Sequence, residues 1–215
     1  MAAVTGVMQD YLKEIYKLQQ DRGAVSTSEI AERLHVSPAS ATNMVKRLAQ
    51  LKLVSYVRYH GFTVTPAGRR IALEIIRHHR LLELYLAREL GVSLELVDRE
   101  AEKMEHVLSE EVEARIATRL GDPTLDPHGD PIPSMDGTVR DVRYPTLDRL
   151  SVGSTGIVAR VSDRNPAVLR RLARLGVLPG VMLKMLRRRA GGCQVEIDGR
   201  QLALSHALCE GVYIQ

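Results

Sequence analysis

The chain has 215 residues, enough for two or three small domains with packed cores, and its 45% hydrophobic content excludes a disordered chain. The net charge of +4 conceals an uneven distribution. Basic residues outnumber acidic ones by 12 to 6 in residues 1–80 and again in residues 141–215, whereas acidic residues outnumber basic ones by 14 to 6 in residues 81–140. An acidic middle between two basic ends predicts at least two kinds of partner.

The targeting and cysteine patterns are typical of a cytoplasmic protein. The N-terminal segment becomes charged at Asp10 and lacks the apolar core of a signal peptide, and no apolar run is long enough to span a membrane. Cys193 and Cys209 are too few for a disulfide framework and lack the C-x-x-C spacing of a zinc site. We therefore expect a cytoplasmic protein with two free structural thiols.

The first part of the chain predicts a winged helix-turn-helix. Apolar side chains recur at helical spacing, Ser26 and Glu29 supply a cap and an acidic first turn, and Ser37 with Pro38 begins a further helix. Two β-prone runs hinged near Gly61 then predict a hairpin, which is the wing. The expected elements are three helices at residues 7–19, 29–34 and 38–51 and a hairpin at residues 53–65.

The acidic middle predicts two long helices, and the end of the chain predicts a small barrel. The helices are expected at residues 66–90 and 94–120, each closed by a glycine. Residues 122–137 hold four of the nine prolines, so they are expected to form a loop. Short apolar runs separated by glycine turns then predict a bent antiparallel barrel with one helix. Its elements are expected at residues 155–161, 166–175 (the helix), 176–188, 193–197, 201–204 and 212–214.

The third helix carries the residues expected to read DNA. Short polar groups near its start suit base edges, and basic groups farther along suit phosphates. Asn43 has the donor and acceptor that match an adenine edge. A solvated helix face is the alternative, but the cap, the turn, the wing and the basic charge agree on DNA binding. The predicted DNA contacts are Ser37, Ala39, Ser40, Thr42, Asn43, Lys46 and Arg47 in the helix, with Tyr59 and His60 in the wing.

The acidic middle also carries His and carboxylate side chains at helical spacing. Carboxylates that share one helix face repel each other unless cations compensate, and a divalent metal ion is one such compensator. Solvated helix faces are the alternative that the spacing leaves open. The neighbouring His78 is expected at a surface or interface, and His128 is interpreted as an ordinary polar residue. The candidate metal ligands are His79 and Glu83 on one predicted helix, and Asp98, Glu102, Glu105 and His106 on the next.

These motifs resemble the diphtheria toxin repressor family of metal-dependent transcriptional regulators, especially its manganese transport regulators. The match lies in residues 8–16, 30–34, 77–83, 105–113, 127–133 and 172–205. The resemblance implies a mainly α fold with a β wing. Its expected parts are a winged helix-turn-helix domain at residues 1–72, a helical metal-binding and dimerisation domain at 73–140, a linker at 141–152, and a small SH3-like (FeoA-like) β-barrel at 153–215.

The resemblance also implies a set of metal ligands. Iron-responsive members tend to have a thioether in place of Asp10, an imidazole in place of Asp98 and a thiol in place of Glu102. Carboxylates at these positions favour Mn(II) as the cofactor, with Fe(II) as the alternative. Lys13 replaces an acidic ligand of some manganese members, which leaves the number of ions open. The implied ligands are Asp10, His79, Glu83, Asp98, Glu102, Glu105 and His106.

The expected function is that of a Mn(II)-activated repressor of metal transport genes, which binds a palindromic operator in double-stranded DNA as a homodimer. Metal binding would fix the angle between the winged helix and the dimer core. The alternatives are an Fe(II)-responsive repressor and a winged-helix regulator that does not sense metal. An enzyme is not expected, because the chain lacks an H-E-x-x-H motif, a nucleophile elbow and a phosphate loop. Neither a membrane nor a small organic substrate is expected as a partner.

Overall fold

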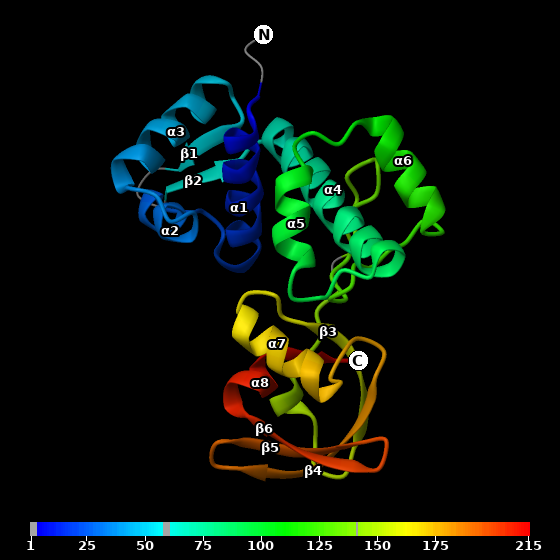
Figure 1. The fold of residues 1–215 in the computed structure, drawn as a ribbon. Coiled ribbons are helices and arrows are strands. Elements are labelled where there is room, and N and C mark those ends of the chain that lie inside the picture. The colour runs from blue at the N-terminus through cyan, green and yellow to red at the C-terminus, as the bar shows by residue number, and fades with distance from the viewer. Residues whose placement is uncertain (1–3, 58–60, 141) are drawn as a thin grey trace. The chain divides into compact units, whose positions relative to one another are not determined.

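The computed structural model describes residues 4–57, 61–140 and 142–215 (Figure 1). The backbone forms two compact units, each of which collects segments that are distant in the sequence. The first unit contains Met1–His79, Lys103–Ser109 and Pro133–Thr138. The second unit contains Arg80–Glu102, Glu110–Ile132 and Val139–Gln215.

The first unit contains a winged helix-turn-helix, as the sequence predicts. Ser26 forms a capping box with Glu29, and Ser37 caps the helix that begins at Pro38, so side chains satisfy the backbone N–H groups at both helix starts. The two strands pair in antiparallel register. The elements are α1 (Gly6–Arg22), α2 (Thr27–Arg33), α3 (Pro38–Gln50), β1 (Val54–Val57) and β2 (Gly61–Val64), followed by α4 (Pro66–Leu90), which begins in this unit.

One apolar core holds the winged helix together. Leu12 on α1, Leu48 on α3 and Phe62 on β2 are buried in it. Burying one such side chain stabilises the folded chain by about 1.5–3 kcal/mol. Gly61 has a φ of 112°, and a Cβ at this position would lie 2.1 Å from the backbone oxygen of Val25. Only glycine therefore allows β2 to pair with the chain at Val25.

The single helix expected at residues 94–120 is wrong, because two shorter helices occupy this range. They are α5 (Val97–Met104) and α6 (Glu110–Arg119), and a turn followed by two residues without regular structure joins them. Glu105 lies in this turn, fully buried, and its carboxylate contacts Lys13 and His79. These contacts with distant segments fix the turn. They could not be predicted from the apolar periodicity of residues 94–120, which reflects only local sequence.

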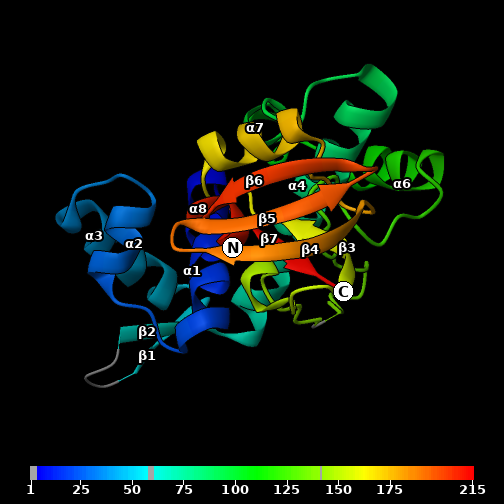
Figure 2. The ribbon, with the colours of Figure 1, turned by 90° about the horizontal axis from the view of Figure 1, so that it is seen from below.

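The end of the second unit forms a five-stranded antiparallel sheet in the order β6-β5-β4-β3-β7. Figure 2 shows β4, β5 and β6 side by side, with α7 beside them. Cys193 and Cys209 lie in its apolar core as free thiols, as expected, with their Sγ atoms 2.9 Å apart. The short helix α8 was not expected from the sequence. The elements are η1 (Leu147–Arg149), β3 (Thr155–Val161), α7 (Pro166–Leu175), β4 (Met182–Arg189), β5 (Gly192–Ile197), β6 (Arg200–Ser205), α8 (His206–Glu210) and β7 (Val212–Ile214).

Residues 122–132 of the proline-rich segment form a folded loop that packs on β3 within the second unit. The Asp126 carboxylate accepts hydrogen bonds from the backbone N–H groups of His128 and Asp130, at 2.8 and 2.9 Å. The backbone N–H of Val161 donates to the oxygen of His128 at 2.9 Å. Gly129 has a φ of 89°, and a Cβ there would lie 2.1 Å from the oxygen of Ala159. The loop is therefore fixed by its own hydrogen bonds and by close contact with the sheet.

In the part of the chain that the structure describes, no helix combines the length and the apolar character needed to cross a membrane. This includes α4, whose 25 residues would be long enough but carry many charges.

Candidate metal centre

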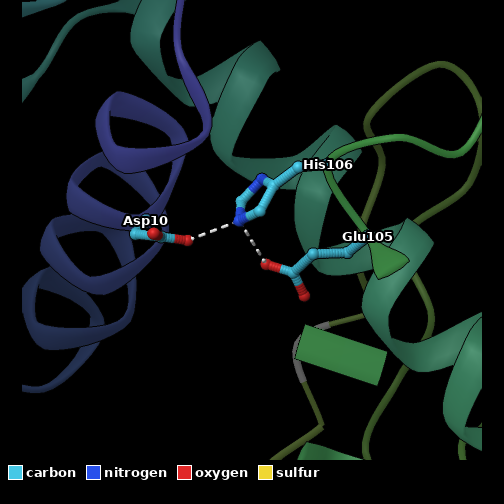
Figure 3. Close-up of side chains that lie close together, drawn as sticks. All are labelled: Asp10, Glu105 and His106. Atoms are coloured by element: carbon cyan, nitrogen blue, oxygen red, sulfur yellow. Dashed lines mark ion pairs between the residues drawn. The ribbon is translucent and has the colours of Figure 1, made fainter. Parts of the chain in front are cut away.

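A metal-competent cluster forms in the first unit between α1 and the turn that follows α5 (Figure 3). Asp10 extends from α1, and Glu105 and His106 extend from the turn. The His106 Nε2 atom lies 2.8 Å from Asp10 Oδ1 and 3.6 Å from Glu105 Oε1. One potential ligand atom of each residue lies within 4.8 Å of the others, so the three side chains can share one ion.

The ring of His106 is held in an orientation that suits ligation. Its Nδ1 atom lies 2.8 Å from the side-chain oxygen of Gln9, which only accepts hydrogen bonds, so Nδ1 carries the proton. The Nε2 lone pair then faces Asp10 and Glu105. Gly6 leaves room for the ring, because a Cβ at this position would lie 3.2 Å from His106 Cγ. Such partners of a ligating imidazole fix both its tautomer and its direction.

Glu105 is fully buried and has partners on both carboxylate oxygens. Lys13 Nζ lies 2.6 Å from Oε1, and His79 Nδ1 lies 2.5 Å from Oε2. Burial raises the pKa of Glu105, but hydrogen bonds and charges from His79 and Lys13 outweigh it, and the net pKa lies below its ordinary value. Glu105 is therefore an ionised carboxylate at neutral pH. His78, expected at a surface or interface, is instead buried within the chain, and its Nδ1 lies 3.0 Å from the Glu105 backbone oxygen.

The donor chemistry of this cluster fits a divalent metal ion. Two carboxylates supply hard oxygen donors, and one imidazole supplies a borderline nitrogen donor. Neither a thiol nor a thioether belongs to the group, so its chemistry suits Mn(II) or Fe(II) better than metals that prefer sulfur.

A second metal-competent cluster lies in the second unit and was missed at the sequence level. It consists of Glu83 on α4 with Asp126 and His128 in the proline-rich loop, all three buried. His128 is fully buried, and among the described residues neither ring nitrogen has a hydrogen-bond partner. Its Nδ1 atom lies 3.6 Å from Glu83 Oε1. The interpretation of His128 as an ordinary polar residue is therefore wrong, because its ring faces a carboxylate in a buried cluster.

The electrostatics of the second cluster also favour a bound cation. Burial and the neighbouring charges of Asp130 and Glu83 raise the pKa of Asp126 well above its ordinary value, and the Arg80 guanidinium opposes them. Arg80 Nε lies 3.5 Å from Asp126 Oδ2. A buried imidazole with unused nitrogens beside crowded carboxylates is a donor set that a divalent cation would satisfy. The sequence signal was the D-P-H-G-D run, in which two acids flank a histidine.

The other predicted ligands lie on α4 and α5. His79 and Glu83 are one turn apart on α4. His79 contacts Glu105 of the first cluster, whereas Glu83 is itself part of the second cluster and lies beside His128. Asp98 and Glu102 are one turn apart on α5, where both are exposed. Glu105 and His106, expected to continue that helix, lie beyond its end.

The helix predicted to contact DNA presents a continuous exposed face. Ala41 and Leu48 of α3 are buried, whereas most of the predicted contacts are exposed on the other side. Thr42 is half-buried, and its hydroxyl donates to the oxygen of Pro38 at 2.8 Å, so it helps to fix the first turn. Tyr59 and His60 lie outside the described residues. The exposed predicted contacts are Ser37, Ala39, Ser40, Asn43, Lys46 and Arg47.

Comparisons with known protein families match three consecutive parts of the chain. Residues 3–62 match the N-terminal DNA-binding domain of the iron-dependent repressors, and residues 65–134 match their metal-binding and dimerisation domain. Residues 146–215 match the FeoA domain. These matches agree with the mainly α architecture with a β wing and an SH3-like C-terminal domain that the sequence predicts.

Individual relatives give the same result. The chain is 29% identical to the iron-dependent repressor IdeR of Mycobacterium tuberculosis over 95% of each chain. It is 42% identical to the HTH-type transcriptional regulator MntR of Geobacillus kaustophilus over 49% of this chain and 74% of that protein. Among solved structures, it resembles a manganese-dependent transcriptional repressor in complex with manganese, with a TM-score of 0.89 and 40% identity over 97% of this chain and 99% of that one.

Proposed function

The chain belongs to the diphtheria toxin repressor family of metal-dependent transcriptional repressors, and from this premise we propose that it represses metal transport genes when Mn(II) binds. The observation that carries the proposal is the cluster of Asp10, Glu105 and His106 in the first unit. It joins the first helix of the winged helix-turn-helix to a turn more than ninety residues later in the chain.

The residues of this cluster connect metal binding to DNA binding through α1. Asp10 lies on the helix that supplies Leu12 and Ile15 to the core of the DNA-binding domain. An ion held by Asp10 and His106 would favour one position of α1 relative to the turn, because ligation requires both side chains at once. A coupling of about 1–3 kcal/mol would change operator affinity about 5- to 150-fold.

The proposed metal is Mn(II), and Fe(II) is the second candidate. The oxygen-rich donor set and the likeness to a manganese-dependent repressor favour manganese. The likeness to iron-dependent repressors keeps iron as the alternative to be tested. We further propose that Asp126 and His128 join Glu83 in holding a cation, because His128 has no other partner for its ring nitrogens in the described part of the chain. The full proposed ligand set is Asp10, His79, Glu83, Asp98, Glu102, Glu105 and His106, with Asp126 and His128 added.

DNA recognition is assigned to α3 and the wing. The exposed face of α3 would enter the major groove, with Asn43 toward base edges and with Lys46 and Arg47 toward phosphates. Tyr59 and His60 are proposed as wing contacts. Two copies of the chain would bind the two halves of a palindromic operator. We assign DNA binding to residues 1–72, metal binding and dimerisation to residues 73–140, a linker to 141–152 and the SH3-like domain to 153–215.

Operator binding titrated with metals tests this function. The chain would select a double-stranded fragment from random-sequence DNA in the presence of Mn(II), and its affinity for that fragment would be measured under anaerobic conditions with Mn(II), Fe(II), Co(II) or Zn(II). We expect Mn(II) to tighten binding, and Asp10→Ala and His106→Ala to abolish that dependence. Activation by Fe(II) at lower concentration than Mn(II) would replace the manganese assignment. Binding that is unchanged by a chelator would favour a regulator that does not sense metal.

A further inference from the structure

We propose that Lys13 is a built-in cation of the cluster formed by Asp10, Glu105 and His106, and that its ammonium group takes the place of a second metal ion. The cluster then holds one divalent ion rather than two. This inference rests on the proposed function, because it concerns the number of ions in the same donor set.

The burial of Lys13 is the first observation that supports it. Its side chain is only 3% exposed, and Nζ lies 2.6 Å from Oε1 of the fully buried Glu105. A lysine is almost never buried to this extent without a charged partner. Lys13 follows Asp10 by three residues on α1, which places both side chains on one side of that helix. The ammonium group therefore enters the cluster from the helix that also supplies a proposed ligand.

The occupancy of the Glu105 carboxylate is the second observation. Lys13 binds Oε1 and His79 contacts Oε2, so each oxygen already has one partner. A carboxylate oxygen has a further lone pair, and one metal ion can still bind. A second divalent ion bridged by Glu105 would have to approach the ammonium group or displace it. The hydrogen bond between Lys13 and Glu105 thus leaves room for one metal ion and disfavours binding of two.

The charge of the cluster gives the third argument. Asp10 and Glu105 supply two negative charges, and Lys13 cancels one of them. One divalent ion would bring the total charge of these three side chains and the ion to +1, and a second ion would bring it to +3. A second divalent ion would leave a buried excess of positive charge, which is unfavourable in a site of low dielectric.

A purely structural ion pair is the competing explanation, and metal stoichiometry distinguishes the two. A structural pair predicts that the ion count does not change when Lys13 is replaced. A built-in cation predicts that a carboxylate at position 13 admits a second ion, because it adds a ligand and removes a positive charge.

The experiment uses the full chain with Lys13→Glu, Lys13→Met and the control Lys17→Met. Lys17 lies one turn farther along α1, is 34% exposed and pairs with Glu14 instead. Each protein is also prepared with Asp10→Ala, so that ions bound elsewhere in the chain are subtracted. Bound Mn(II) per chain is measured by equilibrium dialysis with metal analysis, electron paramagnetic resonance reports whether two Mn(II) ions are neighbours, and thermal unfolding checks that each variant is folded.

We expect one Asp10-dependent ion in the unmodified protein and in Lys17→Met, and two neighbouring ions in Lys13→Glu. Lys13→Met should admit the second ion only at higher Mn(II) concentration, because it adds no ligand. The inference is overturned if a folded Lys13→Glu variant keeps one Asp10-dependent ion, or if the unmodified protein already holds two. The number of ions in the unmodified protein is measured without any Lys13 variant, so it tests the inference even where those variants do not fold. If Asp10→Ala leaves the Mn(II) count of the unmodified protein unchanged, the proposed function fails instead.

Discussion

His106 is positioned by its neighbours independently of any bound metal. Gln9 accepts a hydrogen bond from its Nδ1, and the absence of a side chain at Gly6 leaves space for its ring. Neither residue was identified from the sequence, because ligand motifs report donor atoms and not the groups that orient them. The residues that tune this cluster are therefore Gln9, Gly6 and Lys13, which all lie on α1 beside Asp10.

At the same scale, we predict that Gln9→Leu weakens Mn(II) binding at the Asp10-dependent position by about 10- to 100-fold, because loss of the outer partner releases the ring of His106. Gln20→Leu is the matched control, since Gln20 is an exposed glutamine on the same helix. Equilibrium dialysis with Mn(II) measures both. An equal effect of the two substitutions would mean that the hydrogen bond to His106 does not orient the ligand.

At the scale of elements, the pairing of β2 with the segment at Val25 depends on glycine. We predict that Gly61→Ala destabilises the first unit by about 1–3 kcal/mol, because it combines backbone strain with a Cβ placed 2.1 Å from a backbone oxygen. Gly23→Ala is the control, since Gly23 also has a positive φ of 83° but its Cβ would meet no described atom within 4 Å. Chemical denaturation measures the free energy of unfolding of both variants, of which Gly23→Ala adds backbone strain alone and Gly61→Ala adds strain and a steric clash. Equal losses of stability would contradict the close approach of residue 61 to the Val25 oxygen.

The contact between α1 and α2 gives a prediction that depends on pH. Arg33 Nε lies 2.6 Å from Glu14 Oε2. Burial raises the pKa of Glu14, but Lys17, Arg33 and Lys13 outweigh it, so the pKa lies below its ordinary value. A lowered pKa means that the ionised pair stabilises the fold above the unfolded-state pKa of glutamate, and that this stability is lost as the pH falls through the folded-state pKa.

We therefore expect Arg33→Met to lower stability by about 1 kcal/mol at neutral pH, a modest value because Arg33 is 42% exposed. The difference from the unmodified chain should shrink in acid, where Glu14 is protonated in both proteins. Urea denaturation at several pH values measures it. In a double-mutant cycle with Glu14→Gln, additive losses would show that the two side chains do not interact.

The elements differ in how far the sequence alone determines them. α3 and α4 were predicted closely, because Pro38 and Pro66 begin them and their apolar spacing continues to their ends. The break between α5 and α6 was not predicted, because it depends on contacts of Glu105 with Lys13 and His79 from distant segments. Likewise, residue spacing identified His79 and Glu83 but missed His128, which reaches Glu83 through the fold of a loop.

At the scale of the whole molecule, the two clusters account for part of the acidic excess of residues 81–140. The acidic middle of the chain supplies Glu105 to the first and supplies Glu83 and Asp126 to the second. Each cluster gathers carboxylates that would repel one another without a compensating cation. The excess acidity of residues 81–140 is therefore not only a solvated surface, because part of it is buried where cations would be held.

The second cluster depends on the sheet, because Arg160 of β3 holds the loop that carries Asp126 and His128. Arg160 lies 2.8 Å from the Asp130 carboxylate and stacks on the ring of Tyr213 at 3.9 Å. We predict that Arg160→Met loosens the loop and weakens Mn(II) binding at the second cluster by about 10-fold, since support of the ligands is lost while the ligands stay. The Asp10-dependent ion should be unaffected.

Mn(II) titration of Arg160→Met measures this change, with His128→Ala defining which ion belongs to the second cluster. Arg174→Met on α7 is the control, because it removes the same charge from an exposed position of the same unit. If Arg160→Met and Arg174→Met bind metal alike, the sheet does not support the cluster, and the role of the C-terminal domain must lie elsewhere. If only Arg160→Met loses the His128-dependent ion, the SH3-like domain contributes to metal binding, because the ion pair between Arg160 and Asp130 holds the loop that carries the ligands.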